Sequence, residues 1–331
     1  MKILCLRFSS IGDIVLTSPV TRALHQQIGA EVHFVTKKSF EPIVASNPHI
    51  ARVFSFDKDI RPIVPDLRKE RYDWIIDLHH NLRSQQLIML LCRPSRAFNK
   101  LNVEKWLLVN TGLNLLPKTH IVERYMATVA HLGAHYDGKG LDFFIPENQE
   151  IKLADLSPHL SPGNYVALVL GATHATKRMP KEKIAALIRL IDAPVVLLGG
   201  KAEAETGRWI GAQSGIRVID TCGQLSLLQS ASVVAQAGKV VTHDTGLMHI
   251  AAALGKDIVS IWGSTIPGFG MYPFLADGKG SNVTMEVEGL RCRPCSKIGH
   301  ERCPKGHFRC MNLLDENALA RAASLHLDEK N

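Results

Sequence analysis

Residues 239–263 read KVVTHDTGLMHIAAALGKDIVSIWG, and this stretch decides the fold. A β-branched run ends at His243, an apolar helical stretch follows from Gly246 to Leu254, and a second apolar run ends at Trp262. The pattern predicts a strand, a tight turn, a helix and a second strand. Together they form one βαβ unit of a parallel sheet.

The turn of this unit, residues 244–247, comprises Asp244, Thr245, Gly246 and Leu247. The first amides of a helix have no partner inside the helix, and its dipole favours negative charge there. A phosphate or diphosphate is therefore the natural ligand, and Gly246, which lacks a Cβ, lets it approach the backbone. The alternative is that Asp244 or Thr245 only caps the helix and that His249 is a packed core residue.

Strands and helices alternate on both sides of a region rich in Gly, Pro, Asp and Asn, residues 137–164. The alternation predicts two doubly wound parallel-sheet domains, residues 1–155 and 156–331, that face each other across a cleft. Ligands of such sheets bind beyond the carboxyl ends of the strands. The last helix, expected over 315–327, could pack back on the first domain. The expected strands cover 2–8, 31–36, 53–56, 74–78, 165–170, 195–198, 217–219, 240–242 and 258–262.

The composition is that of a two-domain chain of 331 residues with a net charge of +8. No apolar run reaches the roughly 18 residues of a membrane span. The N-terminal run MKILCLRF is interrupted by Arg7 and lacks a cleavage site, so we expect a first strand and a cytoplasmic protein. The basic charge suits a nucleotide, a phosphorylated lipid, a membrane surface or nucleic acid. Because only 6% of the residues are aromatic and no nucleic-acid module is recognisable, we expect no nucleic-acid partner. We also expect a monomer.

A second polar turn, SSIGD, follows the first strand at residues 9–13. Gly12 allows a tight turn, and the carboxylate of Asp13 could accept a proton from a substrate hydroxyl. The alternative is a capping box in which Ser10 and Asp13 satisfy the first amides of the next helix.

Two further turns carry groups that suit a nucleotide. In residues 170–180, LGATHATKRMP, Lys177 and Arg178 could hold diphosphate oxygens and Thr173 could hydrogen-bond them; the alternative is a solvated basic loop. After the next strand, the glycine pair at 199–200 lets a nucleoside approach, and Glu203 could accept ribose hydroxyl protons. An ordinary turn between strand and helix explains this second motif equally well.

Four of the seven cysteines are clustered near the end of the chain. Disulfides are disfavoured in a cytoplasmic protein, so the spacing C-x2-C-x7-C-x6-C indicates a structural zinc site. The alternative is a set of reduced thiols packed in a loop. The cluster comprises Cys292, Cys295, Cys303 and Cys310, with His300 and His307 as substitute ligands.

Four motifs stand in one order: SSIGD near residue 10, THATKRMP near 176, LGGKAE near 200 and DTGLMHIAAALGKDIVSIWGSTIPG from 244. Together they resemble glycosyltransferase family 9, the heptosyltransferases of lipopolysaccharide inner-core assembly. The resemblance implies a GT-B fold, with the acceptor bound mainly by the first domain and the nucleotide-sugar by the second. It also implies the donor ADP-L-glycero-D-manno-heptose, inversion at the anomeric carbon and no catalytic metal.

The same resemblance implies roles for individual residues. The catalytic base falls on Asp13, near Ser10 and Gly12 of the acceptor side. The donor-binding residues would be Thr173, Lys177, Glu203, Asp244, Thr245, Gly246, Leu247 and His249. The chain departs from the family at Met179, where an aromatic residue commonly precedes the proline.

The acceptor loops match no motif of the family. Basic residues of the first half are candidates for contacts with a phosphorylated lipid A–core acceptor at the inner face of the cytoplasmic membrane, and a solvated basic surface is the alternative reading. They are Arg61, Arg83, Arg96 and Lys100. Two other functions stay open at this point. One is a nucleotide-sugar epimerase or a GT-B transferase with another donor, and the other is a basic, zinc-bearing nucleic-acid-binding protein.

Overall fold

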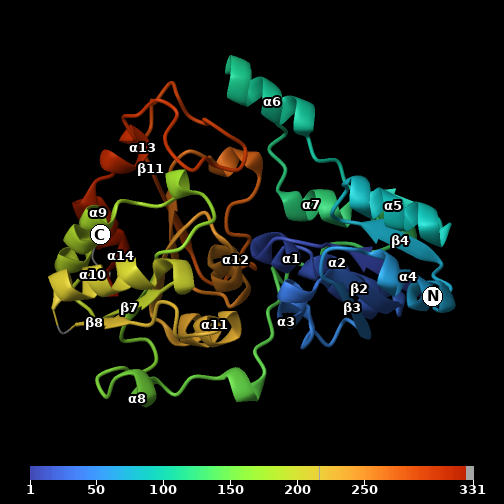
Figure 1. The fold of residues 1–331 in the computed structure, drawn as a ribbon, viewed down its shortest axis with the longest axis horizontal. Coiled ribbons are helices and arrows are strands. Elements are labelled where there is room, and N and C mark those ends of the chain that lie inside the picture. The colour runs from blue at the N-terminus through green and yellow to red at the C-terminus, as the bar shows by residue number, and fades with distance from the viewer. Residues whose placement is uncertain (216, 326–331) are drawn as a thin grey trace. The chain divides into compact units, whose positions relative to one another are not determined.

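The computed structural model describes residues 1–215 and 217–325, which form two compact units (Figure 1). The first unit consists of residues 1–101 and 118–144, and the second contains residues 102–117 and the chain from Ile145 onward. The first unit thus ends before residue 155. The chain beyond Phe144 belongs to the second unit because the backbone of Ile151 hydrogen-bonds with side chains of helix α11 (Leu227–Gln236) at 2.9 Å.

The first unit is built on a parallel five-stranded sheet with the order β3-β2-β1-β4-β5. Its inner strands are near-continuous apolar runs, as expected where helices cover both faces. The strands are β1 (Lys2–Leu6), β2 (Glu31–Lys37), β3 (Arg52–Phe56), β4 (Trp74–Asp77) and β5 (Ser95–Ala97). The helices are α1 (Ile11–Val15), α2 (Ser18–Ile28), α3 (Glu41–Val44), α4 (Val64–Lys69), α5 (Leu82–Leu91) and α7 (Ile121–Met126).

The helix expected after β1 is divided into α1 and α2. Pro19 lies in the first turn of α2, where its missing N–H costs no hydrogen bond, so the chain restarts a helix at Ser18. Helix α1 begins at Ile11, which places Asp13 in its first turn.

The second unit contains a parallel six-stranded sheet with the order β11-β10-β9-β6-β7-β8. Strand β11 was not expected, because it is a half-exposed edge strand without a clear apolar alternation. The strands are β6 (Val166–Val169), β7 (Val195–Leu198), β8 (Val218–Asp220), β9 (Lys239–His243), β10 (Ile258–Trp262) and β11 (Asn282–Glu286). The helices, besides α11, are α6 (Asn102–Thr111), α8 (Leu153–Leu156), α9 (Lys181–Leu190), α10 (Ala204–Ser214), α12 (Gly246–Ala253), α13 (Arg309–Asn312) and α14 (Glu316–Ala323).

The last helix packs on its own unit. Leu319 and Ala323 of α14 are fully buried in the core formed with α9 and the second sheet. Lys239 donates from Nζ to the carbonyls of Ala322 and Ser324, at 3.0 and 2.8 Å, which satisfies the C-terminal end of the helix. The described part of the expected last helix therefore packs within the second unit, and residues 326–327 of the expected helix lie outside the described residues.

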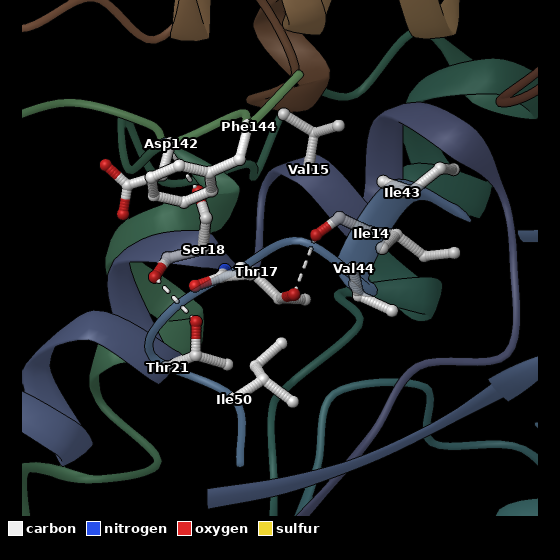
Figure 2. Close-up of a pocket in the computed structure, with 11 residues that line it drawn as sticks. Ile14, Val15, Thr17, Ser18, Thr21, Ile43, Val44, Ile50, Asp142 and Phe144 are labelled. Carbon is white, nitrogen blue, oxygen red and sulfur yellow. Dashed lines mark hydrogen bonds between the residues drawn. The ribbon is translucent and has the colours of Figure 1, made fainter. Parts of the chain in front are cut away.

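The acidic residues after α7 fasten the connecting segment to the first unit. Arg22 of α2, only 3% exposed, binds both carboxylate oxygens of Asp137 at 2.8 Å, pairs with Asp142 at 2.5 Å and donates to the carbonyl of Gly140 at 2.9 Å. A small pocket lies beside this contact, as Figure 2 shows. It is lined by Ile14, Val15, Thr17, Ser18, Thr21, Ile43, Val44, Asn47, Ile50, Asp142 and Phe144. None of the predicted site residues is among them.

None of the helices within residues 1–215 and 217–325 has the length and apolar character needed to span a bilayer.

Candidate functional site

The predicted site residues follow the strands at which each sheet reverses its order. The first sheet reverses between β1 and β4, and the second between β6 and β9. In open α/β sheets this switch point is where the loops diverge and ligands bind. The turn that carries Asp13 follows β1, the Lys177 loop follows β6, and the Asp244 turn follows β9. The topology thus gives each unit one candidate binding edge.

Asp13 lies in the first turn of α1 with both carboxylate oxygens engaged. Oδ2 accepts hydrogen bonds from the amide and the hydroxyl of Ser10, at 3.1 and 2.8 Å, and Oδ1 lies 2.7 Å from a guanidinium nitrogen of Arg7. The bond from the Ser10 amide is the half of a capping box that the alternative interpretation of this turn expects, whereas the Ser10 hydroxyl donates to the carboxylate and caps no amide. Gly12 is buried, whereas the Asp13 side chain is 19% exposed. The Asp13 side chain is therefore partly accessible at the surface.

Arg7 is a site residue that the motif did not reveal. It is 7% exposed and donates to the carbonyls of Ser9 and Leu78 and, at 3.0 Å, to the hydroxyl of Tyr125. Burial by itself raises the pKa of Asp13, but the charge of Arg7 and the hydrogen bonds from Ser10 outweigh it, so the pKa lies below its ordinary value. The one feature of the sequence that could have revealed Arg7 is its charge, which interrupts an otherwise apolar strand.

His79 follows β4 at the same edge of the first sheet. Its ring lies 4.7 Å from the ring of Phe8, and burial together with the charge of Arg7 lowers the pKa of His79 to about 3. The side chain is therefore a neutral imidazole at physiological pH. Its backbone amide donates to Asp77, which fixes the turn.

Lys177 and Asp244 meet in the second unit. The Nζ of Lys177 lies 2.7 Å from Oδ2 of Asp244, and the hydroxyl of Thr265 donates to the same oxygen at 2.8 Å. Both members of the ion pair are 15% exposed or less. Three loops, which follow β6, β9 and β10, therefore converge on one carboxylate.

The residues after Asp244 form the start of α12. Thr245 is its N-cap residue with extended backbone angles, and Gly246 and Leu247 supply the first amides of the helix. Thr245, Gly246 and Leu247 are all partly exposed, so these amides lie at the surface beside the Lys177–Asp244 pair. His249 is 2% exposed and lies within the buried part of the helix.

Glu203 lies beside the Lys177 loop. Its carboxylate accepts a hydrogen bond from the amide of Gly200 at 2.9 Å and lies 3.6 Å from a guanidinium nitrogen of Arg178. A Cβ at Gly171 would come within 3.2 Å of the Glu203 carboxyl group, so glycine allows the two loops to approach. The side chain of Thr173 is exposed on the same loop.

A junction of three segments holds the Lys177 loop in place. The hydroxyl of Thr176, 2% exposed, donates to the carbonyl of His300 at 3.0 Å and accepts from the amide of His300 at 2.8 Å and from the hydroxyl of Ser264 at 2.9 Å. The amide of Cys295 donates to the carbonyl of Ser264 at 3.0 Å. The cysteine segment thus supports both the Lys177 loop and the loop that carries Thr265.

Two of the predicted zinc ligands lie close together, but no three of the cluster's ligand atoms lie within 4.8 Å of one another in the described residues. The Sγ of Cys292 lies 3.9 Å from Nε2 of His307, and the thiol of Cys295 donates to the carbonyl of Cys292. Burial and the neighbouring thiols raise the pKa of Cys295 to about 11, and burial likewise raises the pKa of Cys310 to about 11. All seven cysteines are free thiols, Cys303 included.

The described residues contain one group of three metal-ligand atoms within 4.8 Å of one another, and it lies elsewhere. It consists of Glu31, His33 and Glu70 in the first unit. Lys2 already lies 3.2 Å from Glu31 and 2.7 Å from Glu70, so a cation occupies the space between the carboxylates.

The basic residues suggested for the acceptor side differ in their partners and exposure. Arg61 pairs with Asp59 at 2.8 Å and has a side chain that is 76% exposed, whereas Arg83 lies over the ring of Phe56 at 5.9 Å. Arg96 is exposed at the edge strand β5, and Lys100 is half-buried.

Comparison with known proteins gives one consistent result. The profile of glycosyltransferase family 9 (heptosyltransferase) matches residues 60–299. Lipopolysaccharide heptosyltransferase 1 of Pseudomonas aeruginosa is 28% identical over 326 residues, which cover 90% of this chain and 86% of the relative. A glycosyltransferase of family 9 from Veillonella parvula has a similar structure, with a TM-score of 0.78, 20% identity and coverage of 97% and 96% of the two chains.

A second solved structure, an Escherichia coli heptosyltransferase with ADP, has a TM-score of 0.66 and 23% identity, and covers 86% of this chain and 93% of its own. These neighbours confirm the predicted fold of two parallel-sheet α/β domains. The profile covers well over half of the chain, and the family expected from the four motifs is confirmed. The chain belongs to glycosyltransferase family 9, the heptosyltransferase family, and is a glycosyltransferase of the GT-B fold.

Proposed function

We propose that the enzyme transfers heptose from ADP-L-glycero-D-manno-heptose to the inner core of lipopolysaccharide, with inversion at the anomeric carbon. The observation that carries this proposal is the convergence of Lys177, Asp244 and Thr265 beside the start of α12. A mostly buried ammonium beside the first amides of a helix is suited to the diphosphate of a nucleotide-sugar. The solved Escherichia coli relative contains ADP, which supports a nucleotide donor.

On the donor side, Lys177 and the amides of Thr245, Gly246 and Leu247 would bind the two phosphates. Their charge would stabilise ADP as it leaves, at about 2.7–4 kcal/mol of barrier for each well-placed donor. Asp244 would then exchange its contact with Lys177 for hydroxyl groups of the sugar. Glu203 would accept hydrogen bonds from the ribose hydroxyls. The exposed side chain of Thr173 would donate a hydrogen bond to a phosphate oxygen.

On the acceptor side, Asp13 would receive the proton of the acceptor hydroxyl as that oxygen attacks the anomeric carbon. Two hydrogen bonds from Ser10 and the ion pair with Arg7 keep the carboxylate ionised and oriented, which a general base requires. The bond to the sugar forms as the bond to the ADP oxygen breaks. Attack from the face opposite ADP inverts the anomeric centre.

The acceptor in this proposal is a phosphorylated lipid A–core, bound at the inner face of the cytoplasmic membrane. The chain would act there as a monomer, through Arg61, Arg83, Arg96 and Lys100 of its basic first half. The net charge of +8 supports an anionic acceptor.

The test is to incubate the purified protein with ADP-heptose and a panel of truncated core acceptors, with Asp13→Ala and Lys177→Ala beside the wild type. Transfer to one acceptor, lost in both variants, is the expected result. Formation of an altered nucleotide-sugar from the donor alone would indicate an epimerase. Turnover of another ADP-sugar, or unchanged turnover in Asp13→Ala, would contradict the proposed donor or the proposed base.

A further inference from the structure

Helix α6 and the turn after it, residues 102–117, expose an unusual amount of apolar surface. The described residues include thirteen exposed large apolar side chains, and four of them lie in these sixteen residues. They are Val103, Trp106, Leu113 and Leu115, which are 69%, 60%, 52% and 55% exposed. Apolar groups concentrated in this way mark an interaction surface, whereas single exposed apolar residues need no explanation.

Two of the exposed side chains lie on the helix, and Leu113 and Leu115 lie in the turn after it. Val103 and Trp106 are three residues apart and therefore neighbours on the surface of α6, which is labelled in Figure 1. Leu108, on another face of the helix, is 8% exposed. Trp106 is the exposed one of the four tryptophans: Trp262 is buried, and the other two are half-buried.

Basic residues surround this segment in the sequence. Residues 93–118 contain five basic residues and one acidic residue, a net charge of +4 that is half of the chain's +8. The basic residues are Arg93, Arg96, Lys100, Lys105 and Lys118, and three of them, Arg93, Arg96 and Lys118, are exposed. Another protein surface would not need so strong an excess of positive charge, whereas anionic lipid headgroups complement it.

We infer that residues 102–117 form a membrane-docking element, which places Trp106, Val103, Leu113 and Leu115 at the boundary between headgroups and acyl chains of an anionic bilayer. A tryptophan at that depth keeps its ring in apolar surroundings and its N–H among polar groups. Apolar insertion and electrostatic attraction together give the two contributions that stable peripheral binding requires. The inference rests on the proposed function, since a lipid-linked acceptor would lie at a membrane surface. Membrane binding can nevertheless be measured without heptose transfer.

The experiment is vesicle flotation of the full chain with phosphatidylglycerol–phosphatidylcholine vesicles and with pure phosphatidylcholine vesicles. We expect binding to the anionic vesicles that weakens as salt is raised, and quenching of Trp106 fluorescence by brominated acyl chains. The double variant Val103→Ser/Trp106→Ser should bind roughly tenfold more weakly. Arg93→Gln, Arg96→Gln and Lys118→Gln should each weaken binding about fivefold at low salt. Leu190→Ser, which changes a side chain that is 48% exposed on α9, is the matched control and should bind as the wild type does.

Two readouts keep the inference distinct from the proposed function. The double variant should retain its thermal midpoint and its turnover of a water-soluble acceptor, because both side chains are exposed. Absence of vesicle binding, or equal binding by the double variant, would overturn the inference even if heptose transfer is observed. A dimer in light scattering that disappears in the double variant would identify a second copy as the occupant and would also overturn it. Vesicle binding without heptose transfer would leave the docking element standing and remove the proposed function.

Discussion

The Nζ of Lys177 lies 2.7 Å from Oδ2 of Asp244, although the two residues belong to loops that follow different strands of the second sheet. Both side chains are largely buried, so each charge depends on the other for compensation. In the proposed function, the diphosphate would compete with Asp244 for the ammonium group. The pair would then hold Lys177 in place before the nucleotide binds.

The first prediction concerns this ammonium group. Lys177→Met should weaken ADP binding about 10- to 100-fold, because a charge-assisted hydrogen bond contributes about 1.5–3 kcal/mol. Isothermal titration calorimetry with ADP measures the effect directly. Lys177→Arg keeps the charge and serves as the control, and equal ADP affinity in Lys177→Met would show that the diphosphate lies elsewhere.

The second prediction concerns the partner of Asp13. In Arg7→Met the charge that lowers the pKa of Asp13 is lost, so the pKa should rise by about one unit or more. The acidic limb of the kcat/KM profile should move to higher pH by the same amount. Arg7→Lys keeps the charge and should leave the limb close to its wild-type position. If the limb stays fixed in Arg7→Met while the protein remains folded, Asp13 does not titrate in catalysis.

The third prediction concerns the junction at Thr176. Thr176→Val removes the acceptor of the His300 amide and the partner of the buried Ser264 hydroxyl, while the His300 carbonyl keeps its bond from the Thr176 amide; the loss should lower the free energy of unfolding by about 1–3 kcal/mol. Because Lys177 is the next residue, the KM for the donor should rise more than kcat falls. Thr176→Ser retains the hydroxyl and should restore most of both quantities. A stability loss with an unchanged KM would mean that the junction does not position the donor loop.

The fourth prediction concerns acid stability. Burial lowers the pKa of His243 to about 4, and its Nε2 accepts a hydrogen bond from the amide of Met179 at 3.0 Å. A folded pKa below the unfolded value of about 6.5 means that the unfolded chain binds the proton first, so stability is complete above pH 6.5 and falls toward pH 4. The loss from this residue should be about 2 kcal/mol at pH 5. Urea unfolding of wild type and His243→Gln at pH 7.5 and pH 5 measures it, and parallel losses in both proteins would contradict the assignment.

The fifth prediction concerns the cysteine segment. We propose that Cys292, Cys295, Cys303 and Cys310 bind one structural zinc ion, with His300 and His307 as substitute ligands. Metal analysis of protein purified without chelator should find close to one zinc per chain, and Cys292→Ser should lower that ratio. Because this segment supports Thr176 through Cys295 and His300, zinc removal should also raise the KM for the donor. Protein free of metal but with full donor affinity would show that the thiols have only a packing role.

Local sequence patterns predicted the strands and turns that depend on residues close together in the chain. The buried strands β6, β7, β9 and β10 are nearly continuous apolar runs, and all four were predicted. The turns after β1, β6 and β9 were predicted as ligand edges because the carboxyl ends of parallel strands share one side of a sheet. The Ser10–Asp13 contact spans only three residues, so spacing alone could reveal it.

Contacts between distant parts of the chain could not be predicted from periodicity. Arg7 and Tyr125 are 118 residues apart, and Thr176 and His300 are 124 apart, so these pairs exist only once the sheets have formed. The edge strand β11 was missed because a half-exposed edge needs few apolar residues. In the cysteine segment the spacing identified the group, but the positions of its thiols depend on the surrounding fold.

If Asp13 is the base, as proposed, the hydroxyl of Ser10 affects acceptor affinity, since it already donates to Oδ2 of Asp13 at 2.8 Å. An acceptor hydroxyl that arrives at this oxygen replaces one O–H···O bond by another of the same kind, so the net enthalpy gained at this atom is close to zero. Discrimination between acceptors must then come from sugar and phosphate groups remote from the reacting oxygen. Acceptors that differ only beside that oxygen should bind alike and differ in rate.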